Sequence, residues 1–236
     1  MAAKNTYDES KIKTLSSLEH IRLRTGMYIG RLGNGSNPDD GIYILLKEVL
    51  DNSIDEFIMG NGDRIDALLK DNKVTVRDYG RGIPLGKVVE CVSVINTGAK
   101  YNDEVFQFSV GLNGVGTKAV NALSEYFRVV SVRDGKYAEA VFERGVLKHE
   151  KQGDAKKGIK NGTLVEFIPD REIFGDYTFN LDFIEKRMWN YAYLNAGLTL
   201  TFNGASYISE NGLLDLLNAE IGEETLYTIA HFKEAK

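Results

Sequence analysis

The chain is poor in cysteine, in proline and in long apolar runs. Of its 236 residues only one is cysteine and three are proline. Because Cys91 has no partner in the chain, no intrachain disulfide can form, which favours a reducing compartment. The most apolar stretch, residues 42–50, is interrupted by Lys47 and Glu48 and is far too short to span a membrane. The first residues, MAAKNTYDESKIK, contain no apolar signal core, so we expect a soluble cytoplasmic protein without a membrane partner.

An excess of positive charge is also missing. The chain has 29 Lys and Arg against 34 Asp and Glu, a net charge of −5. This balance argues against a protein that grips a nucleic-acid backbone over a wide surface, although a local basic loop lies at residues 151–162. With 43% apolar and 27% charged residues the composition is that of a globular protein and excludes wholesale disorder. The length allows one large domain, or one and a half, with a sizeable core.

Hydrophobic periodicity and the spacing of turn residues predict a mixture of helices and strands. We expect helices over residues 15–25, 41–60, 88–96, 117–124, 181–195 and 212–219. We expect strands over residues 66–70, 73–78, 128–133, 136–144, 146–150, 163–169, 198–203 and 226–232. We expect a turn at residues 26–30, a mobile loop at 97–117, and core positions for Trp189, Tyr191 and Tyr193.

The two ends of the chain differ from its middle. Residues 1–14 are polar, show no clear period and are expected to form an arm. The strand expected at 226–232 has no following segment with which to pair, so we expect a fragment cut just inside a second domain. The predicted organisation is an arm at 1–14, a main domain at 15–220 and the start of a truncated domain at 221–236.

One predicted helix carries a stripe of chemically active side chains. At 100° per residue, Asp51, Asn52 and Asp55 lie within about 60° of Glu48, and apolar residues fill the opposite arc. Within this segment the only base is Lys47. The stripe can bind a cation or accept a proton, or it can be an ordinary acidic surface of a helix.

A glycine motif precedes the helix expected at 117–124. The run Gly111-Leu-Asn-Gly114-Val-Gly116-Thr-Lys118 approaches both a P-loop and a dinucleotide fingerprint. In the first case Lys and Thr are transposed, and in both the required preceding strand is missing, so we reject both. The glycines still permit a phosphate to approach backbone N–H groups at the start of a helix, and they equally permit a flexible loop.

A third motif follows the strand expected at 73–78. In Asp78-Tyr-Gly80-Arg-Gly82 the carboxylate at the strand end can accept a hydrogen bond from an exocyclic amine, while the glycines leave room for a flat ring. A simple Asp-initiated turn explains the same residues. Thr163, after Gly162 at the start of a later strand, has a hydroxyl that can support Asp78, although Gly-Thr pairs are common.

Taken in order, these motifs resemble a known family. E-x-x-D-N-x-x-D, D-x-G-x-G, G-x-x-G-x-G and G-T follow the nucleotide-binding pattern of the ATPase superfamily of DNA gyrase, Hsp90, histidine kinases and MutL. Longer strings, among them residues 24–30, 78–84, 97–100, 110–116 and 120–124, resemble the B subunit of bacterial type II topoisomerases, with general similarity favouring topoisomerase IV over gyrase. The resemblance spans about residues 7–220. It implies an α+β two-layer sandwich of the Bergerat type, with a mixed, mostly antiparallel sheet of about eight strands covered by helices on one face.

The resemblance also implies roles for single residues. Glu48 matches the general base that activates water, Asn52 the Mg²⁺ ligand, and Asp78, with Thr163 beside it, the residue that reads the adenine amine of ATP. The remaining nucleotide contacts implied are Asp55, Arg81, Gly82, Ile83, Pro84, Lys100, Gly111, Leu112, Asn113, Gly114, Val115 and Gly116, with Arg133 at the edge of the pocket. Tyr7 and Ile12 match an arm that reaches the nucleotide of a second copy in a homodimer.

Some positions depart from the family pattern. Tyr43 and Ile44 stand where many relatives carry a His pair that supports the base, Thr25 stands where Pro is usual, and Asn113 stands where His is common. A lysine of the second domain that contacts the γ-phosphate in the family would lie beyond Lys236. We therefore expect this chain to bind ATP well and to hydrolyse it weakly.

Three functions share this fold. The first is a Mg²⁺-dependent ATPase clamp that dimerises on ATP binding and drives DNA strand passage together with an A subunit, the DNA being held by the complete enzyme. The second is a histidine kinase, disfavoured because such kinases usually have Asn where Glu48 stands, and because none of the three histidines lies in an evident dimerisation helix. The third is a chaperone or mismatch-repair ATPase of the Hsp90 or MutL type, which the longer strings disfavour.

Overall fold

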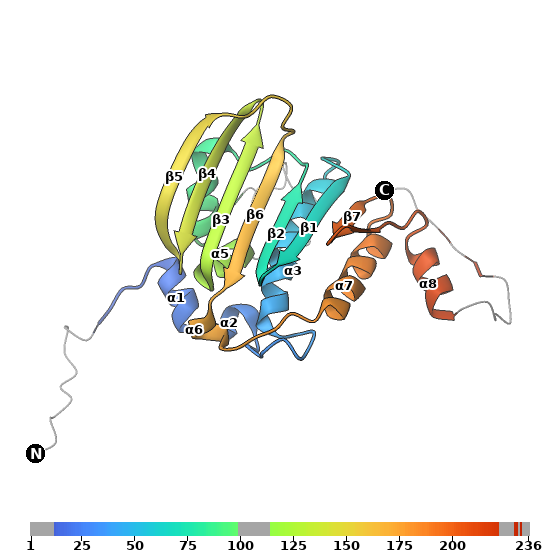
Figure 1. Ribbon diagram of the computed structural model, residues 1–236, viewed down its shortest axis with the longest axis horizontal. Helices are drawn as coiled ribbons and strands as arrows, with labels where there is room; N and C mark the ends of the chain where they lie inside the picture. Colours follow the sequence, from blue (N-terminus) through green and yellow to red (C-terminus); the bar gives the residue numbers. More distant parts are fainter. Residues whose placement is uncertain (1–11, 99–113, 222–228, 231, 233–236) are drawn as a thin grey trace, which may run out of the picture.

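The molecule is built on one mixed sheet of eight strands. The computed structural model describes residues 12–98, 114–221, 229–230 and 232, and every structural statement below refers to them. The strands lie in the order β5-β4-β3-β6-β2-β1-β7-β8, and every neighbouring pair is antiparallel except the parallel pair β1 and β7 (Figure 1). Their bounds are β1 Arg64–Lys70, β2 Lys73–Asp78, β3 Ser124–Arg133, β4 Lys136–Glu143, β5 Val146–Asp154, β6 Gly162–Pro169, β7 Thr199–Phe202 and β8 Ala205–Tyr207.

Helices cover one face of this sheet. In the view of Figure 1, α3, α4 and α5 lie behind the strands, α1 and α6 lie at one end of the sheet, and α7 lies beside β7 and next to α8. Their bounds are α1 Ser17–Leu23, α2 Gly26–Ile29, α3 Gly41–Ile58, the 3₁₀ turn η2 Leu85–Lys87, α4 Val88–Ser93, α5 Gly116–Ala122, α6 Arg171–Phe174, α7 Leu181–Leu194 and α8 Leu213–Ile221. The predicted two-layer sandwich is confirmed.

Alternating burial along the strands sets which side chains face the helices. In β2, residues 74, 76 and 78 are buried while 73, 75 and 77 are only partly covered. Val74 and Val76 therefore join the core with Phe127 of β3 and Phe167 of β6. Because the period of a strand is two residues, Asp78 at the end of β2 points into the same layer as these two valines.

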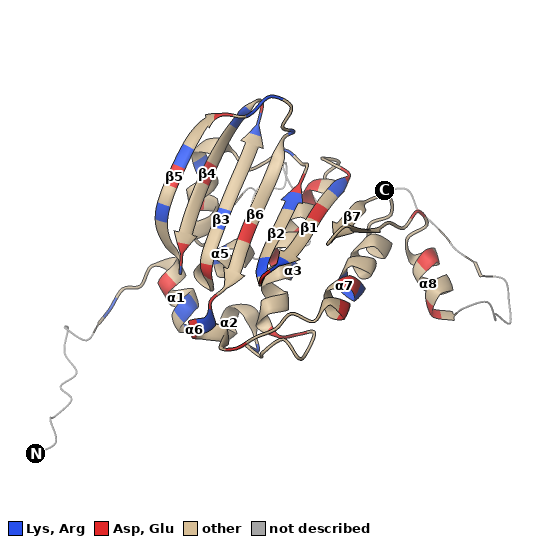
Figure 2. Ribbon diagram, viewed as in Figure 1, with Lys and Arg blue, Asp and Glu red and all other residues tan. Residues whose placement is uncertain are grey.

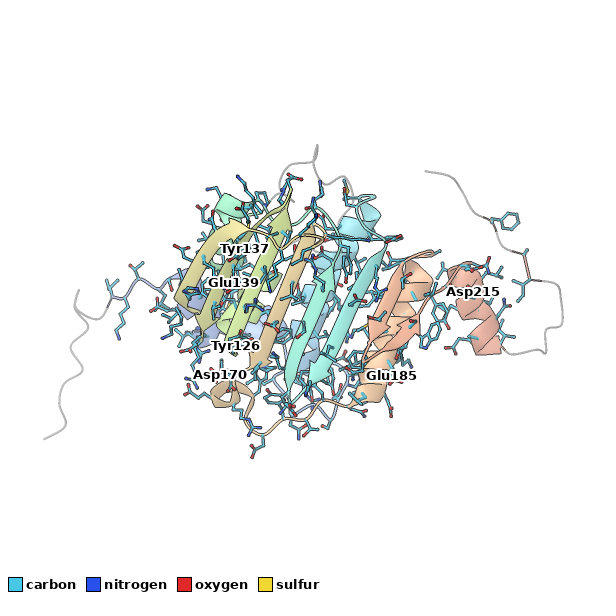
Figure 3. All side chains as sticks on the ribbon, turned by 45° about the horizontal axis from the view of Figure 1, so that its top comes forward. Tyr126, Tyr137, Glu139, Asp170, Glu185 and Asp215 are labelled. Carbon is cyan, nitrogen blue, oxygen red and sulfur yellow. The ribbon has the colours of Figure 1, made fainter. Side chains whose placement is uncertain are left out.

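The other face of the sheet carries a ladder of ion pairs. Arg128 on β3 contacts Glu139 on β4 and Glu166 on β6, each at 2.7 Å. Lys151 on β5 extends the ladder to Glu139 at 3.1 Å, and Lys73 on β2 extends it to Glu166 at 3.3 Å. Figure 2 shows the alternating charges along the strands, and Figure 3 shows Glu139 on the sheet between Tyr137 and Tyr126. Because charged side chains cover this face of the sheet, it can be exposed to solvent.

Several local predictions need correction. Residues 26–29 form a helical turn, α2, where a plain turn was expected, and β5 continues to Asp154, into the expected basic loop, because it keeps pairing with β4. β3 begins at Ser124, four residues early. The short elements α6 and β8 were not expected, since four and three residues are too few to show a period. Trp189, expected in the core, is 39% exposed and stacks on Tyr193.

Some predictions lie outside the described residues. These include most of the mobile loop expected at 97–117, most of the strand expected at 226–232 and most of the arm at 1–14. The two proposed domain boundaries, at 14/15 and 220/221, stay predictions. In the part of the chain that the structure describes, no helix has the length and apolar character needed to cross a membrane.

Candidate nucleotide-binding site

Helix α3 presents Glu48 and Asn52, one turn apart, next to the start of α5. The Asn52 amide nitrogen donates to the backbone oxygen of Glu48 at 2.7 Å and to Thr117 Oγ1 of α5 at 2.8 Å. Glu48 is 27% exposed. Gly116, the first residue of α5, lies so close that a Cβ there would be 1.9 Å from Glu48 Oε2. The two helices thus meet at a carboxylate and an amide, and a side chain at 116 would displace the Glu48 carboxylate.

The amide oxygen of Asn52 is a candidate ligand for a cation. Since its nitrogen donates twice within the protein, Oδ1 is the atom suited to hold a cation. Among the described residues no cluster of three or more His, Cys, Asp or Glu could hold a metal. A Mg²⁺ ion that keeps waters and takes other oxygens from phosphates needs only one protein oxygen, and this donor set fits such an ion.

The acidic stripe predicted on α3 divides into two groups. Asp51, which the helical angle places beside Glu48, is only 2% exposed and contacts Lys47 and Tyr191. It is therefore not a candidate ligand of a cation, and this part of the expectation is wrong. Asp55 has no exposed surface, so its side chain lies in the protein interior. Its predicted contact with nucleotide stays a prediction.

Asp78 ends β2 as a buried carboxylate with one oxygen engaged. Its Oδ1 accepts hydrogen bonds from the backbone N–H groups of Gly80 and Thr163, both at 3.0 Å. Oδ2 has no hydrogen-bond partner among the residues that the structure describes. Burial raises the pKa of Asp78 to about 6, against the opposing effects of the two backbone donors and of Arg77. The support from Thr163 comes from its backbone, where its hydroxyl was expected.

Two glycines allow the chain to close around Asp78. Gly162 has φ +130°, and a Cβ there would lie 2.3 Å from the backbone oxygen of Asp78. Gly82 has φ +76°, and a Cβ there would meet the backbone oxygen of Val132 at 2.7 Å. Any side chain at either position would push β6 or β3 away from the end of β2.

The segment after Asp78 is held from two sides. Arg81 donates to Glu56 at the end of α3 through its backbone nitrogen at 2.9 Å, through Nε at 3.1 Å and through Nη2 at 2.9 Å. From β3, Ser131 donates to the backbone oxygen of Ile83 at 2.6 Å, and Arg133 contacts that of Gly82 at 3.4 Å. Residues 81–83 therefore have a fixed path beside the buried carboxylate.

Three of these supporting residues were missed by sequence reasoning. Thr117 holds Asn52, Glu56 holds Arg81, and Ser131 holds Ile83. Glu56 follows the acidic stripe of α3 directly, and Thr117 was considered only as part of a rejected P-loop. Ser131 carried no signal, because a serine inside a strand pattern has no distinguishing context.

The remaining predicted site residues fall into three groups. The first group leads into short helices: residues 114–116 lie at the start of α5, and the exposed Pro84 directly precedes η2. Ile12 is 67% exposed and belongs to no helix or strand. Tyr7, Lys100, Gly111, Leu112 and Asn113 lie outside the described residues.

Tyr43, at the place of the expected histidine support, is committed elsewhere. It is 1% exposed, its hydroxyl donates to the backbone oxygen of Gly35 at 2.7 Å, and it accepts from the backbone nitrogen of Asn180 at 2.8 Å. These bonds tie the loop before α3 to the segment before α7. The Tyr43 hydroxyl therefore does not support Glu48.

The chain is similar to proteins of known function. It is 62% identical over 227 residues to the B subunit of DNA topoisomerase 4 from Borreliella burgdorferi, covering 96% of this chain and 38% of that protein. It is 40% identical over 221 residues to the B subunit of DNA gyrase from Thermus thermophilus, covering 89% of this chain and 34% of that protein. The chain thus spans less than two fifths of the length of these relatives.

A solved structure and a family model agree with these relatives. The "43K ATPase domain of Thermus thermophilus gyrase B in complex with an aminocoumarin" superimposes with a TM-score of 0.75 at 33% identity, over 91% of this chain and 57% of that one. Residues 37–172, which include α3, Asp78 and Thr163, match the family described as "Histidine kinase-, DNA gyrase B-, and HSP90-like ATPase". The chain belongs to this family of ATPases.

Proposed function

We propose that the chain binds and hydrolyses Mg-ATP as the nucleotide-operated clamp of a type II topoisomerase, within its B subunit. The observation that carries the proposal is the presence of two features in one fold. The first is the buried carboxylate of Asp78, whose Oδ2 is not hydrogen-bonded by the described residues. The second is the carboxylate of Glu48 and the amide of Asn52, one turn apart on α3. The similarity to relatives named as topoisomerase IV and gyrase proteins supports this function over a kinase or a chaperone.

The adenine end is assigned to Asp78. Oδ1 is occupied by two backbone donors, so Oδ2 is the acceptor for the exocyclic amine of adenine. Ile83 and Pro84 line the ring, and Arg81 and Arg133 form its rim. Because Arg81 is locked on Glu56, this rim exists before the nucleotide arrives.

The phosphate end is assigned to α3 and the start of α5. Asn52 Oδ1 would hold Mg²⁺, which neutralises charge on the phosphates when it is bound. Glu48 accepts the proton of a water aligned on the γ-phosphate. We assign Lys100 and residues 111–116 to a lid over the phosphates, with the N–H groups of residues 114–116 as donors. Phosphoryl transfer needs such positioning more than covalent catalysis.

The named relatives support a larger assembly. We assign residues 1–14, with Tyr7 and Ile12, to an arm that crosses to a second copy when ATP binds, residues 15–220 to the ATP-binding domain, and 221–236 to the start of a transducer domain. The complete protein would act with an A subunit on DNA in the bacterial cytoplasm. The 62% identity favours topoisomerase IV over gyrase.

Discrimination between purines tests the proposal without any mutation. Guanine presents a carbonyl oxygen where adenine presents its amine, so it would face the acceptor Asp78 with a second acceptor. Calorimetric titration with a non-hydrolysable ATP analogue and Mg²⁺ should give a saturable heat, and the GTP analogue should bind at least about 100-fold more weakly. Equal binding of both analogues, or of neither, would contradict the proposed function.

A further inference from the structure

Asp51 is a buried carboxylate with both oxygens engaged. It is 2% exposed and lies on α3 one turn after Lys47. Its Oδ2 accepts from Lys47 Nζ at 2.5 Å, and its Oδ1 accepts from the hydroxyl of Tyr191 on α7 at 2.5 Å. A desolvated carboxylate requires such partners, since an unpaired one is strongly unfavourable. The lysine ammonium is thereby fixed against the surface of α3.

The Tyr191 hydroxyl remains protonated and donates a hydrogen bond to Asp51. Burial, and next the charge of Asp51, raise the pKa of Tyr191 far above its ordinary value, so its hydroxyl keeps its proton at any physiological pH. The contact joins α7 in the outer part of the molecule to the helix that carries Glu48 and Asn52. A tyrosine expected only to fill the core therefore has a polar partner next to the site.

The fixed ammonium lies beside Glu48. Lys47 Nζ is 3.9 Å from Glu48 Oε1, while a Cβ at Gly116 would lie 1.9 Å from Oε2. Lys47 is 37% and Glu48 27% exposed, so water screens their attraction only in part. One oxygen of the Glu48 carboxylate is thus near an ammonium, and the other is near the start of α5.

We propose that Lys47 is a positioning residue for Glu48, held by Asp51 and Tyr191, and that this chain of contacts aims the carboxylate at the attacking water. The inference rests on the proposed function, because it gives Glu48 the role of general base. Tyr43 cannot take this role, since its hydroxyl is occupied by Gly35 and Asn180. A base that is misplaced by a fraction of an ångström loses rate without losing substrate affinity.

The test compares kcat for ATP hydrolysis with the affinity for a non-hydrolysable analogue in the 236-residue chain. Lys47→Gln alone would leave Asp51 short of a partner and risks unfolding, so the informative variant is the neutral pair K47Q/D51N. We expect it to keep analogue affinity within about twofold and to lower kcat about tenfold. Lys47→Arg should recover most of the rate, because it restores a cation that can reach Asp51.

A matched control removes an ion pair far from the site. Lys148 Nζ on β5 is 3.5 Å from Glu143 Oε2 on β4, and both side chains are exposed. The double variant K148Q/E143Q should therefore leave both kcat and analogue affinity unchanged. An unchanged kcat in K47Q/D51N, an equal loss of affinity and rate, or no recovery in Lys47→Arg would each overturn the positioning role. Equal binding of the ATP and GTP analogues by the wild-type chain, or binding of neither, would instead overturn the proposed function itself, so the two failures are distinguishable.

Discussion

The proposed adenine end and the proposed phosphate end of the site are built in different ways. At the adenine end, Asp78 is 5% exposed and is held by backbone N–H groups of its own turn and of β6. At the phosphate end, Glu48 and Asn52 are more accessible and are held by side chains of α3 and α5. Backbone contacts within a sheet leave little freedom, whereas contacts between helices can shift. Under the proposed function, the base would therefore be read by a rigid surface and the phosphates by an adjustable one.

The burial of Asp78 has a cost that the phosphate end does not share. A carboxylate whose pKa is raised by burial is a group that the fold would hold more easily without its charge. In the proposed function this cost is offset by recognition, because an acceptor whose second oxygen accepts from a ligand discriminates strongly between bases.

The largest expected effect is on the chemistry at the phosphate end. Glu48→Gln keeps the shape of the side chain and removes its ability to accept a proton. We expect analogue binding within a few-fold of wild type and turnover lower by about 100-fold or more, measured by phosphate release. Unchanged turnover would remove Glu48 from the mechanism and leave only the adenine end of the comparison.

The next effect concerns stability at the adenine end. Asp78 has a folded-state pKa of about 6, above its ordinary value, so the folded state binds more protons between about pH 4 and 6. The contribution of Asp78 to stability is therefore greatest below pH 4 and is lost as the pH rises to 6. We expect Asp78→Asn, whose Oδ1 can still accept both backbone bonds, to be more stable than wild type at pH 7 by up to about 3 kcal/mol.

Denaturant unfolding of both proteins across this pH range checks the sign. The difference between Asp78→Asn and wild type should grow from pH 4 to 6 and then stay level. A variant that is less stable at pH 7 would show that the charge of Asp78 is favourable to the fold.

The smallest effect is expected from the link between α3 and α5. Thr117→Val keeps the shape of the side chain and removes the hydroxyl that orients the Asn52 amide. The loss of one hydrogen bond, about 1 kcal/mol, should weaken Mg²⁺-dependent binding of the ATP analogue about fivefold. Thr117→Ser is the matched control and should bind as wild type does. A loss that is equal with and without Mg²⁺ would show that Thr117 does not act through Asn52.

Sequence reasoning reached the fold and the motifs but not the partners of the site. The period of β2 and the breakers after it locate Asp78 at a strand end, and the length of α3 follows from its apolar arc. The burial of Asp51 could not be foreseen, because a helical angle says where a side chain points and not which helix covers it. Tyr191 is more than 130 residues away in the chain, and only the packing of α7 brings it to Asp51.

The same limit explains the errors at Thr163 and Trp189. A hydroxyl was expected to support Asp78, yet the pairing of β6 with β2 brings the backbone N–H of Thr163 to the carboxylate. Trp189 was expected in the core, but it lies on the outer side of α7, where it stacks on Tyr193 and meets Tyr207 edge to face. Residue type predicts burial on average, and the covering element decides each case.

Calorimetric titration of Asp78→Asn with Mg²⁺ and a non-hydrolysable ATP analogue tests the central claim most directly, with Glu48→Gln as the folded control. In this variant Oδ1 would still accept the two backbone hydrogen bonds. The amide nitrogen, which takes the place of Oδ2, would then present an N–H group to the adenine amine. We predict a saturable heat for wild type and Glu48→Gln, and none for a well-folded Asp78→Asn. A wild-type isotherm from Asp78→Asn would contradict the account.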